Sequence, residues 1–123
     1  MKWVLLILSA SFCLSATLAI AADIPLQTPT TITGTISGAK GEFYISTRDT
    51  VSGPGNGFHL SHEPTRHCML SLEALSPAKR KTLEQELAEK ASNGQPMTLH
   101  GEYFPLKERE ETTHHRVAFE VSG

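Results

Sequence analysis

The chain has 123 residues, and its 11 Lys and Arg against 13 Asp and Glu give a formal charge of −2. This length suits one domain with a modest core. The slight acidic excess argues against a general nucleic-acid binder, which usually carries a basic excess.

The first residues carry the pattern of a secretory signal peptide. Lys2 precedes an apolar run over residues 3–12, and small residues follow it. Ala19-Ile20-Ala21 predicts cleavage after the second alanine. A membrane-spanning helix would need about 20 strongly apolar residues, whereas serine and threonine dilute this run. We therefore expect residues 1–21 to be a signal peptide and the mature chain to be periplasmic or secreted, without a stable membrane anchor.

Cleavage would remove one of the two cysteines, Cys13. Cys68 would then be alone, so no disulfide can form within the mature chain. Its neighbours Met69 and Leu70 favour a buried thiol. The alternative is an intermolecular disulfide, or a metal ligand together with His67. About 102 residues with a formal charge of −3 would remain.

Residues 22–29 contain prolines and show no clear pattern, which predicts an irregular leader before a domain over residues 30–123. Thr30–Ile36 is rich in β-branched residues and predicts a strand. Gly34 within it suggests a bend or bulge. Residues 37–41 predict a turn.

A second strand is predicted over Glu42–Thr47. Phe43 and Ile45 share one of its faces, and Tyr44 and Ser46 share the other.

The next segment contains both strand signals and breakers. Residues 53–56, Gly-Pro-Gly-Asn, form a strong breaker cluster. Residues 58–61 then alternate apolar and polar side chains and predict a third strand. Pro64 interrupts this pattern, and residues 67–72 form an apolar stretch of extended or irregular type.

One helix is clearly marked. It begins after Ser76, a preferred N-cap, with Pro77 in the first helical position. Apolar residues at 83, 87 and 91 give it one apolar face. Asn93-Gly94 ends the helix, and Pro96 prevents its continuation.

Two strands are predicted after the helix, over Met97–Phe104 and from His115 or Arg116 to Val121, separated by a polar loop. In the last strand the alternation predicts inward Val117, Phe119 and Val121 and outward Ala118 and Glu120.

The predicted order is three strands, a helix and two strands. Gly34 and Gly101 lie mid-strand, where a tightly coiled barrel needs bends. We expect a mainly β fold with one helix, an OB-fold-like five-stranded Greek-key barrel.

The end of the chain resembles a family of small exported bacterial domains of unknown function. Residues 94–104, GQPMTLHGEYF, and residues 113–121, THHRVAFEV, are similar to that family's ending, G-x-x-V-T-V-x-G-x-L-F followed by a loop, H-H and an apolar strand. Residues 33–35, 43–45 and 64–68 also look similar. The chain departs at Pro96-Met97 and lacks a second mature cysteine. The resemblance implies export and an OB-like layout, and it carries no established activity.

Six histidines raise the possibility of a metal site. Zinc needs three or four ligands about 2.0–2.3 Å from the ion. In a regular strand His59 and His62 would lie on opposite faces, although a turn before Pro64 could bring them together. His100 could be joined by others if the last two strands pair antiparallel. The candidates for zinc or copper are His59, His62, His100, His114 and His115.

A binding face is the better-supported hypothesis. OB-folds bind ligands on the face of their second and third strands and on flanking loops. The residues expected there are Tyr44, Ser46 and His59, with Lys40 in the first loop and Arg109, His114 and His115 in the last.

Three functions follow from these patterns. The first is a non-catalytic binding or accessory module that recognises a protein, peptide or glycan and needs no cofactor; it could be an oligomer. The second is a histidine-based periplasmic metal-binding protein. A small hydrolase has least support, because the chain has no Gly-x-Ser-x-Gly, His-Glu-x-x-His or phosphate-loop motif. Its one suggestive feature is Glu63 beside His62.

Overall fold

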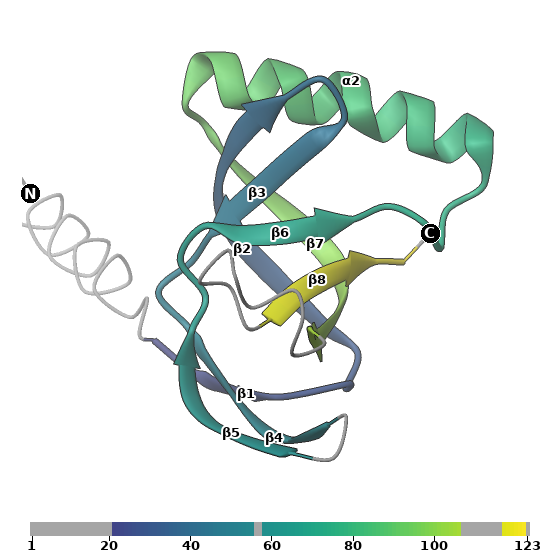
Figure 1. Ribbon diagram of the computed structural model, residues 1–123. Helices are drawn as coiled ribbons and strands as arrows, with labels where there is room; N and C mark the ends of the chain where they lie inside the picture. Colours follow the sequence, from purple (N-terminus) through teal and green to yellow (C-terminus); the bar gives the residue numbers. More distant parts are fainter. Residues whose placement is uncertain (1–20, 56–57, 107–116, 123) are drawn as a thin grey trace, which may run out of the picture.

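The structure is a computed structural model that describes residues 21–55, 58–106 and 117–122. This part of the chain is mainly β with one helix, as predicted (Figure 1). Its elements are β1 (Asp23–Pro25), β2 (Thr30–Ala39), β3 (Glu42–Ser46), β4 (Thr50–Gly55), β5 (Phe58–Pro64), β6 (Cys68–Ser71), α2 (Pro77–Asn93), β7 (Pro96–Pro105) and β8 (Val117–Val121).

Five strands close into a barrel in the order β2-β3-β6-β8-β7, and β7 returns to pair with β2. Neighbours are antiparallel except β6 and β8, which run parallel. In the chain α2 lies between the third and fourth barrel strands, β6 and β7. The predicted five-stranded barrel with a helix at this position is confirmed.

β2 changes partner along its length. Residues 30–35 pair with β7 and residues 35–39 with β3, so the change occurs beside Gly34. A Cβ added at Gly34 would overlap the carbonyl oxygen of Ser46, and one added at Gly101 would overlap that of Glu120. Both glycines therefore permit the close backbone approach that a tightly coiled barrel needs.

The predicted third strand is not a barrel strand, and that prediction was wrong. Residues 58–64 form β5, which pairs with β4 in a separate sheet of order β1-β4-β5. The third barrel strand is β6, in the segment predicted only as extended or irregular. Alternation reports that a strand has one buried face, and both sheets offer such a face. Long-range pairing decides which sheet the strand joins.

Two segments are more regular than their sequence predicted. The leader contains β1, which pairs with β4 in parallel. The breaker cluster starts inside β4, whose pairing with β5 shifts register between Val51 and Gly53. Gly53 has a φ of 139°, which favours glycine. Pro54 lies beyond the last residue that pairs with β1, so its missing N–H is tolerated there.

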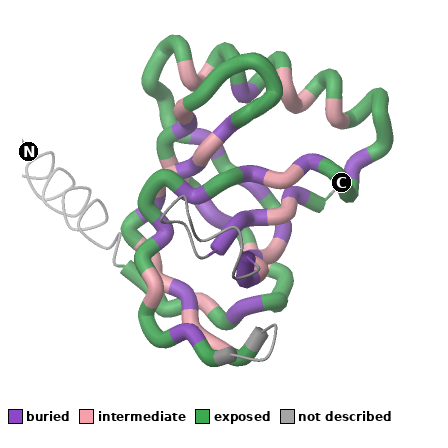
Figure 2. Tube along the Cα trace, in the orientation of Figure 1, coloured by how far each residue is buried: buried purple, intermediate pink, exposed green. Residues whose placement is uncertain are grey.

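One hydrophobic core joins the barrel to the three-stranded sheet. Ile45 and Phe119 from the barrel and Val51 and Leu60 from the other sheet are buried in the same cluster. Figure 2 shows buried segments both in the barrel and in the three-stranded sheet. Each fully buried side chain of this kind contributes about 1.5–3 kcal/mol. The two sheets therefore form one folded unit.

β8 is buried on both faces. The three residues predicted to point inward are buried, but Ala118, predicted to point outward, is also fully buried. Ala118 lies in register between Met69 of β6 and Phe104 of β7. Larger residues therefore flank this small side chain on both sides. Glu120 is half-buried.

The predicted helix is confirmed. Ser76 caps it by accepting a hydrogen bond from the Lys79 N–H, and Gly94 ends it with a left-handed φ of 72°. Leu87 is fully buried, and the helix packs against β2. Figure 1 shows α2 across one end of the barrel and the sheet β1-β4-β5 at the other end. Within residues 21–55, 58–106 and 117–122, no helix has the length and hydropathy required to cross a membrane.

Candidate functional site

The outer surface of β3 and β6 gathers aromatic, polar and apolar side chains. Phe43 and Ile45 are buried in the core, which turns the alternate residues of β3 outward as predicted. Tyr44 lies opposite Met69 in register. Met69 is 38% exposed and is the one large hydrophobic side chain exposed among the described residues. We call this surface the β3–β6 face; it consists of Tyr44, Ser46, His67 and Met69.

A stacked ring pair dominates the face. The ring centroids of Tyr44 and His67 are 4.2 Å apart, with an interplanar angle of 8°. The His67 N–H donates to Ser46 Oγ at 2.8 Å, and His67 Nδ1 lies 3.5 Å from Ser37 Oγ. His67 has a left-handed φ of 54°, which residues other than glycine adopt rarely. Such backbone outliers concentrate at functional sites.

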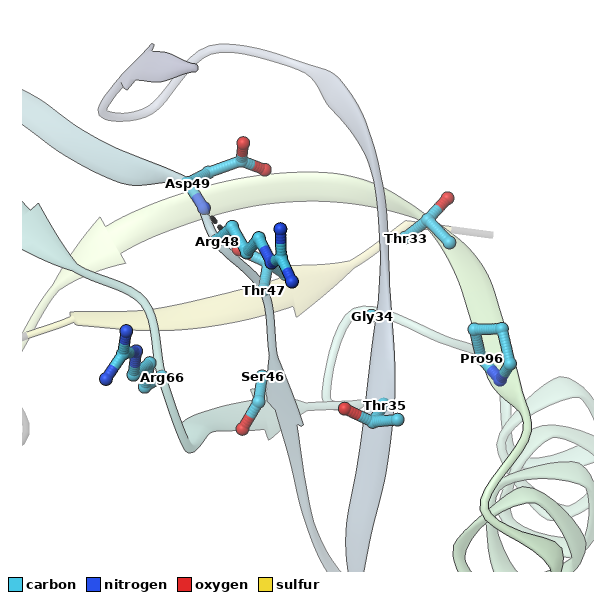
Figure 3. Close-up of a pocket in the computed structure, with 9 residues that line it drawn as sticks. All are labelled: Thr33, Gly34, Thr35, Ser46, Thr47, Arg48, Asp49, Arg66 and Pro96. Carbon is cyan, nitrogen blue, oxygen red and sulfur yellow. Dashed lines mark hydrogen bonds between the residues drawn. The ribbon is translucent and has the colours of Figure 1, made fainter. Parts of the chain in front are cut away.

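A hollow of about 570 Å³ lies beside the β3–β6 face and shares Ser46 with it (Figure 3). Its walls come from β2, from the connection between β3 and β4, from the loop before β6 and from the start of β7. Its other lining residues are Thr33, Gly34, Thr35, Thr47, Arg48, Asp49, Arg66 and Pro96.

The hollow is bordered by two arginines and one carboxylate. In Figure 3 the Arg48 side chain extends toward β2, whereas Arg66 lies on the far side of Ser46 from β2. Both arginines are exposed, and neither forms an ion pair within the described ranges. One oxygen of this carboxylate, Asp49 Oδ1, accepts a hydrogen bond from the Ala22 N–H at 3.0 Å.

Two buried threonines hold in place the connection between β3 and β4, which lines the hollow. The hydroxyls of Thr47 and Thr65 are hydrogen-bonded at 2.5 Å. Thr65 also donates to the carbonyl oxygen of Asp49 at 2.8 Å, and the Asp49 N–H donates to Thr47 Oγ1 at 3.0 Å. These bonds fix the backbone at Thr47 and Asp49, which position the arginine between them.

Two ionisable groups lie in the barrel core. Burial raises the pKa of the Cys68 thiol to about 12, and the thiol donates to the carbonyl oxygen of Val117 at 3.4 Å. The predicted buried thiol is therefore confirmed. Burial also raises the pKa of Tyr103 to about 12. The nearby hydroxyls of Thr47 and Thr65 partly oppose this rise of the pKa. The Tyr103 hydroxyl nevertheless forms no hydrogen bond with any described residue. Both groups stay protonated at neutral pH.

The structure separates His59 from the predicted face. His59 and His62 belong to β5, outside the barrel, while Tyr44 and Ser46 belong to β3. His62 has a φ of 50° and its Nδ1 lies 3.2 Å from Asp23 Oδ1. The prediction that His59 joins Tyr44 was wrong, because it depended on β5 being the third barrel strand.

His100 has a different set of neighbours. Its Nδ1 is hydrogen-bonded to Thr31 Oγ1 at 2.7 Å. β7 and β8 do pair antiparallel, as predicted, but the register places His100 beside Ser122, whereas Val117 at the other end of β8 pairs with Pro105. His114 and His115 lie outside the described residues. Among the residues that are described, no three His, Cys, Asp or Glu side chains form a group that could hold a metal.

Two loop residues, Lys40 and Arg109, were also predicted to belong to the binding site. Lys40 is exposed in the turn between β2 and β3, with a φ of 55°, beyond the end of the β3–β6 face. Arg109 lies outside the described residues.

The sequence did not indicate Arg48 or Arg66 as site residues, and it indicated His67 only as a possible metal ligand beside Cys68, not as part of a binding face. The outward alternation of β3, continued past Ser46, could have identified Arg48. No local pattern links Arg66 or His67 to this strand, because the pairing of β3 with β6 brings them together.

Comparison with protein-family models, with curated proteins and with solved structures found no match to this chain.

Proposed function

We propose that this protein is an exported, non-catalytic binding or accessory module of the OB type. It recognises a protein, peptide or glycan outside the cytoplasm through the β3–β6 face. The observation that carries this proposal is the Tyr44–His67 stack, held by the hydrogen bond to Ser46 and placed beside exposed Met69.

The barrel topology supports the OB assignment. An OB-fold is a five-stranded Greek-key barrel that binds ligands on the face of its second and third strands. Here the second and third barrel strands in the chain are β3 and β6, and α2 separates the third from the fourth. The position of the stacked pair beside these two strands therefore supports the proposed binding surface.

Export is supported by the amino-terminal sequence, where Lys2, an apolar run and Ala19-Ile20-Ala21 form the three parts of a signal peptide. The resemblance to small exported bacterial domains supports the same compartment.

The test compares three variants of the chain that begins at Ala22. Tyr44→Ala removes one ring of the stack. His67→Asn removes the other, and Asn still tolerates the left-handed backbone. His59→Ala is the matched control, because it removes an exposed imidazole from the other sheet.

We expect Tyr44→Ala and His67→Asn to weaken at least tenfold the binding of ligands selected from glycan and peptide arrays. His59→Ala should bind like the unmodified protein. Circular dichroism of each variant checks that it is folded. Retention of every selected ligand by both face variants would exclude the β3–β6 face as the binding site.

A further inference from the structure

We propose that the hollow bordered by Arg48 and Arg66 binds the acidic group of an anionic oligosaccharide that lies across the β3–β6 face. The inference rests on the proposed function, because Ser46 belongs both to the face and to the hollow. It names the class of ligand, which the function alone leaves open.

The two guanidinium groups are the reason to expect an anionic ligand. Guanidinium is always charged in proteins, and its planar fork matches the oxygens of a carboxylate or sulfate. Neither arginine forms an ion pair with a carboxylate in the described ranges. The one acidic side chain at the hollow, Asp49, already accepts the Ala22 N–H. Two arginines against this single carboxylate leave the hollow with a net positive charge, on a chain whose acidic residues outnumber its basic ones.

The hydroxyls around these arginines suit a sugar. A hydroxyl both donates and accepts, as the hydroxyls of a saccharide do. Because Ser46 Oγ accepts the His67 N–H, its own O–H is left to donate. Thr35, exposed on β2, lines the same hollow. A ring seated beside Ser46 can therefore exchange hydrogen bonds with the protein while its acidic group contacts an arginine.

Two other ligand classes fit less well. Peptides often bind by adding a strand to an open sheet edge, whereas the strands beside the hollow belong to a closed barrel. Nucleic-acid binding is favoured by a basic excess, which this chain lacks. Oligosaccharides are the other class that OB-folds bind on this face.

The experiment is a calorimetric titration of the chain that begins at Ala22 with three probes of similar size. Trigalacturonate carries carboxylates on a saccharide, neutral galactotriose lacks them, and triglutamate carries them on a peptide. The variants are Arg48→Gln and Arg66→Gln. Lys81→Gln is the control, because it removes one positive charge from the exposed side of α2.

We expect trigalacturonate to bind at least tenfold more tightly than galactotriose, and more weakly as salt is raised. Each arginine variant should lose about tenfold in affinity, as for a charge-assisted hydrogen bond. Lys81→Gln should change the affinity for trigalacturonate less than twofold.

Three results would overturn the inference. The first is no binding of trigalacturonate at millimolar concentration, or binding unaffected by both arginine variants. The second is that triglutamate binds as tightly as trigalacturonate and also depends on the arginines. The hollow would then recognise negative charge and not a saccharide. The third is that galactotriose binds as tightly as trigalacturonate, and that this binding is lost in Tyr44→Ala but kept in the arginine variants. The β3–β6 face would then bind a saccharide, as in the proposed function, but the hollow would not recognise an acidic group.

Discussion

The hydroxyl of Tyr103 is buried without a hydrogen-bond partner in the described part of the chain. The ring itself packs well, because it is fully buried and contacts Phe119 edge-on with centroids 4.9 Å apart. Such ring pairs contribute about 0.5–1.5 kcal/mol beyond their buried area. An unsatisfied buried hydroxyl costs about 1–3 kcal/mol. The contribution of the ring and the cost of its hydroxyl can therefore be separated.

Tyr103→Phe removes the hydroxyl and keeps the ring, so we expect the free energy of unfolding to stay unchanged or to rise by about 1 kcal/mol. Tyr103→Leu also removes the ring and should lower it by about 2 kcal/mol. Urea unfolding followed by circular dichroism measures both. A decrease of more than about 1 kcal/mol in Tyr103→Phe would mean that the hydroxyl does have a partner in the folded protein.

Asp23 attaches the amino-terminal strand to its neighbours. Its Oδ1 accepts hydrogen bonds from Thr50 Oγ1 at 2.6 Å and from Ser52 Oγ at 3.0 Å, and His62 lies on the same oxygen. The Thr50 hydrogen bond is the main cause that lowers the pKa of Asp23 below its ordinary value of 3.8. The carboxylate therefore stabilises the docked strand above pH 3.8, and this stabilisation is lost as the pH falls through the lowered pKa.

We expect the backbone amide of Thr50 to show an NMR titration with an apparent pKa below 3.8, because its side chain bonds the Asp23 carboxylate. Asp23→Asn removes the titrating group and should abolish this step. A midpoint at or above 3.8, or a step that persists in Asp23→Asn, would contradict the assignment.

At the level of elements, the coiling of the barrel depends on two close backbone approaches. We expect Gly101→Ala to lower the free energy of unfolding by about 2–4 kcal/mol, because its Cβ would overlap the Glu120 carbonyl oxygen and a strand must shift. Gly94→Ala is the matched control. Gly94 has a positive φ but nothing within 4 Å of an added Cβ, so its cost should be about 1 kcal/mol. Equal losses in the two variants would argue against the close approach.

The elements that were predicted correctly carry local signals. The cap at Ser76 and the stop at Gly94 define α2 without any tertiary contact. The alternation of β3 also indicated that Tyr44 and Ser46 point outward. The assignment of residues 58–61 to the barrel failed, because alternation does not identify the partner strand. The contact of His67 with Tyr44 was missed for the same reason, since the two residues meet only when β6 pairs with β3.

At the level of the whole molecule, the barrel and the three-stranded sheet share a single core. Val51 and Leu60 are buried together with barrel residues such as Ile45. Cys68 is buried as a free thiol, and the chain beginning at Ala22 has no second cysteine. Stability therefore comes from packing across the two sheets.

We expect one cooperative unfolding transition, with the same midpoint by far-UV and near-UV circular dichroism and no effect of a reductant. Two resolved transitions would mean that the sheet β1-β4-β5 unfolds independently. A midpoint that falls on reduction would reveal a disulfide between molecules.

Ligand binding on the β3–β6 face, as proposed above, can be followed residue by residue. The most direct measurement is an NMR titration of the isotope-labelled chain with a ligand selected from the glycan and peptide arrays. The predicted result is that the amide shifts concentrate at Tyr44, Ser46, His67 and Met69, with little change at His59 and His62. Shifts concentrated on β5 or α2, with the β3–β6 face unchanged, would show that the ligand binds elsewhere.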